Sequence, residues 1–493
     1  MKELVKKVKE KDNIIIFLVI FCISIGVVLN MEIVATDEIW DFQSVYKLYN
    51  GYKIYEEFNV IVTPLFFYCA EMIFHIFGAN IVVFRLSQCF LMTIYFSLSY
   101  MLLKKLKIPR TISFFVVLGL VTLGIHDIVS FPLIRTGFNY NQMAFMFVIL
   151  GMNLLESERF KKNYILQAII SILVFLTKQT IGIYYIVANI IYLIVSNNSK
   201  KEKIKKSIQY IAIISVGMLL FLFILFIDNN LYNFLNYAFG SISEFADKNI
   251  AIEQKSISFF VDIALINIIA NILVIKNKCF SKCQEETIKQ LFIFAMIFLL
   301  MAYPIFNELH VIMAIYFSLI NLVYVIYNIF KEVKEKICKI IKVINIGCVI
   351  CLIVYSGYNM LEWKKTIQSD EYPYSWEEPF YGGVITKEEY DKNEKVIKYI
   401  ENNEKNVIVL SDRAALYMVP LKRNNGDFDL PLKGNFGSQG EGGLIEKIKN
   451  MENTQFLIYE GDEKVYQEVE QTKEYVKSNM EYVGKIDCFD IYE

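Results

Sequence analysis

The stretch IIIFLVIFCISIGVVLNMEIVATDEIWDF, residues 14–42, joins an apolar run to a cluster of acidic residues. The run has about eighteen residues, close to the number that a helix needs to cross the ~30 Å hydrocarbon core of a bilayer. The lysine-rich segment MKELVKKVKEKDN precedes it, and no small-residue cleavage site follows it. We therefore interpret the run as an uncleaved first membrane span, with the acids just beyond its end.

The composition of the whole chain favours the same class of protein. Hydrophobic residues make up 55% of the 493 residues, and the mean hydropathy is +0.40. Soluble proteins contain about 45–50% apolar residues by a similar count. The formal net charge of −1 does not indicate a nucleic-acid partner. The nine cysteines form no paired metal-binding pattern, and we expect them to be structural.

Further apolar runs of suitable length follow along the chain. Together with the first run they predict about eleven spans, near 14–31, 81–103, 111–127, 141–155, 164–177, 180–197, 207–227, 257–275, 289–304, 309–329 and 340–356. A twelfth stretch, 60–78, has about the right length but contains Pro64, Glu71 and His75. Its assignment depends on the charges in the loops.

Clusters of lysine and arginine set the expected orientation of the spans. They occur in the N-terminal segment and in five loops, near 104–110, 159–162, 200–206, 276–289 and 331–342. All six clusters lie on one side of the membrane only if 60–78 does not cross it, so we predict an interfacial or re-entrant helix there. The N-terminus is then cytoplasmic, and residues 32–80 form the first outer loop of a membrane domain over 1–356.

The last part of the chain, residues 357–493, is richer in charge and shows alternating helix and strand patterns. The predicted helices are 387–403, 443–451 and 463–479, and the predicted strands are 406–410, 455–459 and 481–492, the last broken around Gly484. This order is typical of a small α/β unit. The glycine-rich segment 434–443 follows no strand and lacks a P-loop lysine, so we expect a loop and not a nucleotide site.

The acids after the first span are candidates for chemistry. In a helix beginning at Thr36, Asp37 and Asp41 share a face, and burial near the lipid–water boundary would raise the pKa of such a carboxyl. One of them is therefore a candidate general base. The alternative is that Asp37 and Glu38 simply favour the dipole of the helix whose first turn they occupy.

Basic residues are rare on the predicted outer side. Arg85, Arg135 and Lys178 lie at or near outer ends of spans, where a cation is expensive within lipid and usually has an anionic partner. A lipid-linked phosphate is one such partner, and snorkelling of each side chain to the surface is the alternative. His310 begins a late span, and His126-Asp127 ends an early one. With the acids these groups are candidate ligands of a divalent metal, but their spacing has no metal signature.

Several short motifs resemble those of membrane-embedded GT-C glycosyltransferases, and most closely the bacterial relatives of protein O-mannosyltransferases and the lipid A aminoarabinose transferase. The motifs occur in the order Asp37-Glu38, Tyr49-Asn-Gly, Tyr55-Glu-Glu-Phe, Thr63-Pro-Leu-Phe-Phe-Tyr, Phe77-Gly78, Phe175-Leu-Thr-Lys-Gln-Thr-Ile-Gly, and Tyr303-Pro with His310. The resemblance covers most of the chain and implies a GT-C-like α-helical membrane domain followed by a soluble domain. Each motif is loose, and the match depends on their order and spacing.

The resemblance implies roles for particular residues. Asp37 would be the catalytic base with Glu38 beside it, and Lys178, Arg85, Arg135 and His310 would lie near the phosphate of a polyprenyl-linked sugar donor. Several relatives carry a second acid at the start of the fourth span, where this chain has Asn139-Tyr140-Asn141-Gln142. Asp127 is the candidate replacement. The departure leaves both a second catalytic acid and any divalent metal open.

The sequence therefore predicts an enzyme of the cell membrane that transfers a sugar on the extracytoplasmic face. Its expected partners are a polyprenyl-phosphate-linked sugar, membrane lipid, and an acceptor that is a protein, a lipid or a glycan. The alternative is a lipid-linked glycan flippase or transporter without transferase activity. Against transport, the acids gather at one face, and no pair of Gly/Pro-interrupted spans occurs in matching halves. The C-terminal domain would either recognise the acceptor or pack over the first outer loop.

Overall fold

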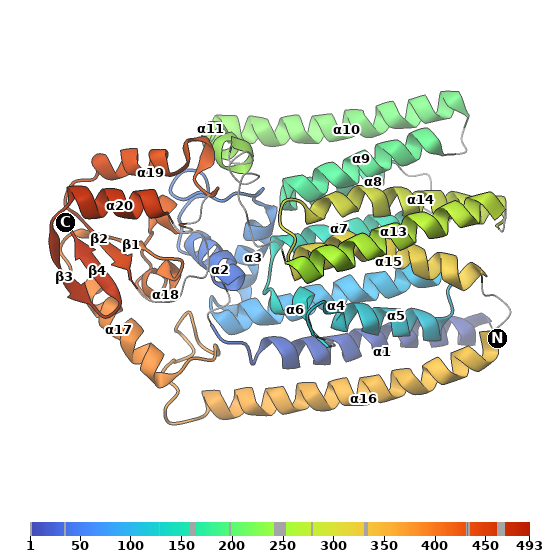
Figure 1. The fold of residues 1–493 in the computed structure, drawn as a ribbon, viewed down its shortest axis with the longest axis horizontal. Helices are drawn as coiled ribbons and strands as arrows, with labels where there is room; N and C mark the ends of the chain where they lie inside the picture. The colour runs from blue at the N-terminus through green and yellow to red at the C-terminus, as the bar shows by residue number, and fades with distance from the viewer. Residues whose placement is uncertain are drawn as a thin grey trace.

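The apolar run that opens the chain lies in one long helix, α1 (Lys2–Val28), of the computed structural model (Figure 1). Helices and loops continue to residue 367, and a small sheet follows near the C-terminus. The structure describes residues 2–33, 36–127, 129–156, 164–196, 199–240, 253–277, 280–329, 334–429, 431, 434–460 and 469–493. The chain thus has a helical bundle and a C-terminal α/β domain, in the order that the sequence predicts.

Five described helices are long and apolar enough to cross a membrane. They are α4 (Ile81–Lys105), α10 (Lys200–Ile227), α13 (Gln254–Asn277), α15 (Glu308–Ile329) and α16 (Lys334–Ile367). The other predicted spans coincide with α1 and with helices of 13 to 17 residues, namely α5 (Arg110–Thr122), α7 (Tyr140–Leu155), α8 (Tyr164–Thr177), α9 (Gln179–Val195) and α14 (Lys282–Phe298). The fold is therefore that of a helical protein with several candidate membrane spans.

Successive long helices along the chain run in alternating directions through the bundle (Figure 1). The N-terminus and the turns that follow α4, α9 and α15 lie at the end far from the C-terminal domain. The basic segments 104–110 and 200–206 belong to that end, and α1 ends beside the C-terminal domain. These two basic segments thus lie at one end of the bundle, whereas the basic loop 159–162 and parts of 276–289 and 331–342 lie outside the described residues.

The ambiguous stretch 60–78 forms the short helix α3 (Leu65–Phe77). Its 13 residues extend about 20 Å at 1.5 Å per residue, less than the ~30 Å of a hydrocarbon core. It contacts α2 (Thr36–Tyr49) and α4, and it lies at the end of the bundle next to the C-terminal domain (Figure 1). Length does not distinguish α3 from a span, because α5 also has 13 residues, so the interfacial or re-entrant position of 60–78 stays a prediction.

An aromatic cluster fixes the first loop to the bundle. The ring of Phe42 on α2 lies 5.5 Å from that of Phe84 on α4, 5.7 Å from Phe74 on α3 and 5.6 Å from Phe380 in the segment after α16. Phe84 also stacks edge-on against Phe138, just before α7. Aromatic packing of this kind adds about 0.5–1.5 kcal/mol per pair beyond burial. It holds α2 in one place relative to the ends of three helices.

The C-terminal domain is built on a four-stranded sheet in the order β1-β2-β4-β3. Strand β1 (Asn406–Leu410) is parallel to β2 (Thr454–Tyr459), and β4 (Phe489–Tyr492) is antiparallel to both β2 and β3 (Tyr482–Ile486). Alternation along β1 sends Val407 and Val409 toward α17 (Lys387–Glu401), and Ile408 and Leu410 toward α19 (Gly440–Lys449) and α20 (Glu470–Asn479). The predicted strands 406–410 and 455–459 are confirmed within a residue.

The last predicted strand, 481–492, is wrong as a single element. It forms the hairpin of β3 and β4, whose turn contains Asp487 at φ +49°. Gly484 does not break the strand but marks a shift of register within β3. A glycine at a bulge and an aspartate in a left-handed turn are both common, and the sequence pattern did not distinguish them. Part of the predicted helix 463–479 lies outside the described residues.

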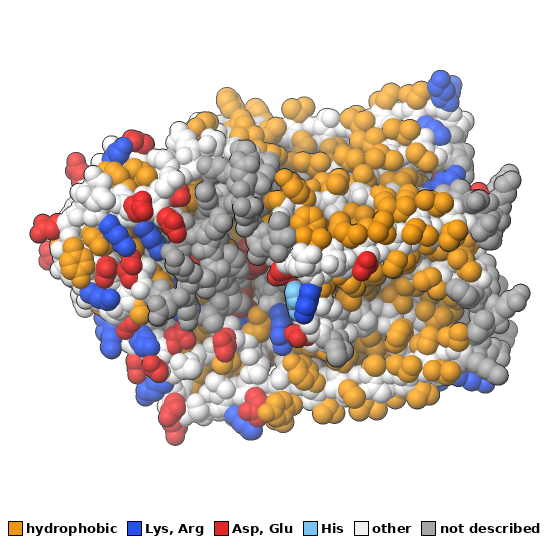
Figure 2. All heavy atoms as spheres, viewed as in Figure 1, with side chains coloured by type: hydrophobic (Ala, Val, Ile, Leu, Met, Phe, Trp, Pro, Cys, Tyr) orange, Lys and Arg blue, Asp and Glu red, His pale blue; other side chains and the backbone are white. Residues whose placement is uncertain are grey.

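The remaining short elements connect these parts. They are α6 (Pro132–Arg135), α11 (Leu231–Leu235), η1 (Asn236–Gly240), η2 (Leu299–Ala302), α18 (Ala414–Met418), η4 (Gly426–Phe428) and η5 (Gly437–Gln439). Figure 2 shows hydrophobic side chains over the length of the bundle and charged ones over the C-terminal domain. Large apolar residues such as Leu219 and Phe223 on α10 are more than half exposed. A surface of this kind is typical of contact with lipid.

Candidate active site

The structure places Asp37 and Asp41 in the first two turns of α2, one turn apart. The side chain of Asp37 is exposed and makes no hydrogen bond or ion pair within the described part of the chain. Asp41 is buried, and its Oδ2 accepts a hydrogen bond of 2.6 Å from Nδ2 of Asn139. The carboxylate of Asp37 is therefore open to a ligand, whereas that of Asp41 is held by Asn139.

Burial raises the pKa of the Asp37 carboxyl, and the nearby Lys178 ammonium partly opposes that shift. The side chain is open to solvent on one side, while protein atoms displace water around the rest of it. Burial also raises the pKa of Asp41 well above its ordinary value, and the charge of Asp37 adds to the effect. Two adjacent carboxyls with raised pKa values are a frequent feature of acid–base sites.

Lys178 is the cation that the structure brings to these acids. It precedes the first residue of α9, and its Nζ donates to Oδ1 of Asn141 and lies 5.1 Å from the ring centroid of Tyr140. Burial lowers the pKa of Lys178 to about 8, against the opposing charges of Asp37 and Asp41. The ammonium is therefore close to its titration range at neutral pH.

Two of the motifs quoted above meet around Lys178. The Oγ1 of Thr63 donates to the carbonyl of Phe175 at 2.6 Å, and Nε2 of Gln179 donates to the carbonyl of Ile61 at 2.9 Å. A Cβ on Gly182 would lie 2.4 Å from Cα of Phe175, so only glycine allows α8 and α9 to pack this closely. The turn that carries Lys178 is thus fixed to the first outer loop.

Glu38 and Arg85 form a fully buried, bidentate ion pair. Arg85 donates from Nε and Nη2 to the two carboxylate oxygens of Glu38 at 2.9 and 2.8 Å. Its other donors go to the carbonyls of Leu29, Met31 and Glu32, just before α2. Arg85 therefore holds the chain beside Asp37, and its hydrogen-bonding capacity is used within the protein. Gly137, at φ +83°, lets the loop before α7 approach Glu38.

The other predicted site residues differ in their surroundings. His310 is in the first turn of α15, its Nδ1 lies 2.7 Å from Oδ1 of Asn307, and the charge of Lys178 acts on it. Arg135 ends α6 and is exposed, with no hydrogen bond or ion pair from its side chain to another described residue. Asp127 is exposed and makes no such contact where the structure is described.

Four helices begin at this place. They are α2, α7, α9 and α15, and the bonds of Asn139 to Asp41 and of Lys178 to Asn141 join three of them. The first N–H groups of a helix have no partners within it, and the helix dipole places partial positive charge there. Together with Lys178 these ends make the site favourable for an anion.

Sequence reasoning assigned no role to three residues that the structure places in the site: Asn139, Tyr140 and Asn141. They stand where the resemblance predicts an acid, and here amide groups contact Asp41 and Lys178 instead. A pair of asparagines around an aromatic residue at the start of a span was the available signal. Among the described residues no group of three or more His, Cys, Asp and Glu side chains could hold a metal ion. The candidate divalent metal therefore finds no ready ligand set in that part of the chain.

A scan against protein-family models returns no match for this chain, and no curated protein matches it. The comparison with GT-C glycosyltransferases therefore rests on the quoted motifs. What the fold itself defines is a largely helical protein with candidate membrane spans and a polar site at the end of the bundle nearest its α/β domain.

Proposed function

We propose that this protein is an integral membrane glycosyltransferase that moves a sugar from a polyprenyl-phosphate donor to an acceptor on the extracytoplasmic face. The observation that supports it most is the exposed carboxylate of Asp37, which has no ion-pair or hydrogen-bond partner among the described residues and on which the charge of Lys178 acts. A base and a cation at one site are what transfer from a lipid phosphate needs. The bundle has an extensive apolar surface, which suits a donor with a lipid chain (Figure 2).

The proposed topology has eleven spans, with the N-terminus in the cytoplasm and the C-terminal domain outside. It is supported by the alternating directions of the helices and by the basic segments at the end opposite that domain (Figure 1). The shorter helices would cross in a bundle whose polar ends reach into the interface. The site at α2 then faces the extracytoplasmic side, where a flipped lipid-linked sugar is accessible.

In the proposed reaction Asp37 accepts the proton of an acceptor hydroxyl. The acceptor oxygen forms a bond to the anomeric carbon, and the bond from that carbon to the phosphate oxygen breaks. Polyprenyl phosphate leaves with the electron pair, and one in-line displacement inverts the anomeric centre. Lys178, together with Arg135 and His310 as the resemblance implies, would stabilise the negative charge that grows on the phosphate.

Glu38 and Arg85 have a supporting part in this proposal. Their mutual ion pair and the bonds from Arg85 to the chain before α2 fix the position of Asp37. A general base must stay within hydrogen-bonding reach of its proton, and a buried bidentate pair gives that rigidity. Asp41 would modulate the charge of Asp37 through their proximity.

The test is product formation by the purified protein in lipid nanodiscs, supplied with a panel of polyprenyl-phosphate sugars and membrane extracts as acceptors. Mass spectrometry should detect a glycosylated acceptor and free polyprenyl phosphate in equal amounts. The alternative, a lipid-linked glycan flippase, predicts movement of intact donor across proteoliposomes without cleavage. Donor translocation with no cleaved product would overturn the proposal.

A further inference from the structure

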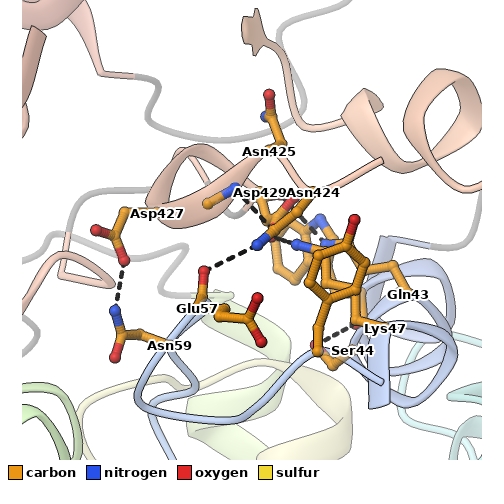
Figure 3. Close-up of polar contacts among 12 residues, drawn as sticks. Gln43, Ser44, Lys47, Glu57, Asn59, Asn424, Asn425, Asp427 and Asp429 are labelled. Carbon is orange, nitrogen blue, oxygen red and sulfur yellow. Dashed lines mark hydrogen bonds and ion pairs between the residues drawn. The ribbon is translucent and has the colours of Figure 1, made fainter. Parts of the chain in front are cut away.

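The C-terminal domain packs directly on α2, the helix that carries Asp37 (Figure 3). Nζ of Lys47, near the end of α2, forms an ion pair with Oδ2 of Asp429, and both side chains are almost completely buried. Nζ also lies 5.2 Å from the ring centroid of Phe58. Burial lowers the pKa of Lys47, while the neighbouring carboxylates of Asp427 and Asp429 favour its ammonium form. The buried ammonium of Lys47 is therefore stabilised by the carboxylate of Asp429 on the other side of the interface.

Two further residues of α2 face the same domain. Nε2 of Gln43 donates to the carbonyl of Asp429 at 3.4 Å, and Nε1 of Trp40 donates to the carbonyl of Asp412 at 3.3 Å. With 3.6 residues per turn, Trp40, Gln43 and Lys47 share one face of α2, turned by about 100° from the face of Asp37. The domain therefore holds one side of the helix while the carboxylate points to another.

The domain is also fixed to the bundle at sites away from α2. Nδ2 of Asn59 donates to Oδ1 of Asp427 at 2.6 Å, and Nδ2 of Asn424 donates to the carbonyl of Glu57 at 2.9 Å (Figure 3). These contacts join the domain to the loop between α2 and α3. They prevent the domain from simply following α2 when that helix moves.

The glycine-rich segment 434–443, which has no nucleotide motif, forms another of these contacts. The backbone N–H and the hydroxyl of Ser438 both donate to Oδ1 of Asn236, at 2.9 and 2.7 Å. Gly437 has φ +73°, and a Cβ there would lie 2.4 Å from Nδ2 of Asn236. The glycine thus permits a close approach between the domain and the loop after α10.

We propose that the C-terminal domain is a positioning part of the active site, and that the buried pair of Lys47 and Asp429 fixes α2 so that Asp37 faces Lys178. The proposal rests on the proposed function, since it assigns a task to the domain within that reaction. The sequence leaves two roles open to the domain, recognition of the acceptor and packing over the first outer loop. The proposal favours packing. Lys47 and Asp429 are positioning residues and do not touch the reacting atoms.

The physical basis is the cost of a buried charge without its partner. When one member of such a pair is removed, the other must become hydrated, lose its charge or move. Both side chains are almost completely buried between α2 and the domain, so hydration of the remaining charge should separate the two. A displacement of about 1 Å at a catalytic group can lower a rate by about 100-fold. Loss of the Lys47–Asp429 pair should therefore lower kcat and change the pKa of Asp37.

The experiment compares Lys47→Met and Asp429→Asn with the wild-type protein in nanodiscs. We expect kcat for sugar transfer to fall about 10- to 100-fold with the donor KM within about twofold. We also expect the acid limb of the pH profile to move to higher pH, since Asp37 loses the nearby charge that lowers its pKa. Backbone amides of residues 36–49 should exchange about tenfold faster with deuterium.

The matched control is Lys405→Met, which removes a partly exposed ion pair with Glu493 near the C-terminus of the same domain. It should leave kcat, the pH profile and exchange in α2 unchanged. If Lys47→Met fails to fold, the isosteric Asp429→Asn decides the question. An unchanged pH profile or unchanged exchange in α2 would overturn the proposal. If the wild-type protein transfers no sugar, the proposed function fails, while exchange in α2 still reports whether the domain positions that helix.

Discussion

Asp37 and Lys178 are 141 residues apart in the sequence, yet their charges act on each other in the folded protein. Both were predicted as site residues, because an acid after a span and a cation between two spans are conspicuous in an apolar chain. The partner of Arg85 could not be predicted. The sequence favours a phosphate, whereas the structure pairs Arg85 with Glu38, 47 residues away. Nothing local in the sequence distinguishes a ligand-binding arginine from one that holds a loop.

The raised pKa of Asp37 and the lowered pKa of Lys178 predict a bell-shaped dependence of kcat/KM on pH. Asp37 acts as a base only when ionised, so activity should rise with pH through its raised pKa, above the ordinary 3.8. Lys178 stabilises the phosphate only when protonated, so activity should fall as pH rises through about 8. Measurement of kcat/KM from pH 5 to 10 checks both limbs.

Lys178→Arg provides the control for that profile, because a guanidinium stays protonated to about pH 12. The alkaline limb should disappear from the measured range, whatever the absolute rate. An alkaline limb at the same pH in the variant would show that another group is responsible.

The buried pair of Glu38 and Arg85 predicts a large effect on stability. Arg85→Ala leaves the Glu38 carboxylate buried without a partner, and we expect it to lower the free energy of unfolding by about 3–5 kcal/mol. Thermal unfolding in detergent measures the loss. Lys53→Ala removes a solvent-exposed pair with Glu56 and should leave the unfolding temperature close to that of the wild-type protein. Equal effects of the two variants would contradict the assigned roles.

At the scale of elements, the positions of the helices were predicted well and their contacts were not. Long apolar runs locate the helices, because lipid-facing segments need a continuous apolar surface, but α1 begins 12 residues before its predicted run and α16 ends 11 residues after its own. The hairpin of β3 and β4 was predicted as one strand, since its turn at Asp487 lacks the usual glycine. The close packing of α8 on α9 could not be predicted either, because it depends on Gly182 lying against Phe175 in the folded protein.

Gly182→Ala tests that packing. A Cβ 2.4 Å from the backbone of Phe175 forces the two helices apart, and overpacking of this kind costs about 1–3 kcal/mol. Both the unfolding temperature and sugar transfer should fall, because the turn between the helices carries Lys178. Gly347→Ala on α16, where no atom lies within 4 Å of the new Cβ, should be neutral or slightly stabilising. A neutral Gly182→Ala would contradict this packing.

At the scale of the whole molecule, the C-terminal domain and the basic segments 104–110 and 200–206 lie at opposite ends of the bundle (Figure 1). The sequence predicts this polarity from its charges. It does not predict that the domain is fixed to α2, because Lys47 and Asp429 are 382 residues apart and each looks like an ordinary surface residue. Long-range contacts of this kind are set by the fold and leave no periodic pattern.

The polarity can be tested with epitope tags in intact cells. With eleven spans, a tag on the C-terminal domain should be digested by external protease, and a tag at the N-terminus should be protected until the cells are permeabilised. If residues 60–78 crossed the membrane, both tags would be on the same side. Protection of both tags in intact cells would contradict the proposed topology.

The most direct measurement is the turnover of Asp37→Asn in nanodiscs, with a polyprenyl-phosphate sugar and its acceptor at saturating concentrations. We predict that kcat falls about 10²- to 10⁴-fold, the usual contribution of a general base. Donor binding should be retained, and the unfolding temperature should be equal or higher, since an unpaired carboxylate with a raised pKa destabilises the fold at neutral pH. Asp228→Asn, which removes another outer carboxylate, should transfer sugar at the wild-type rate. Turnover by Asp37→Asn within about twofold of the wild-type rate would contradict the account.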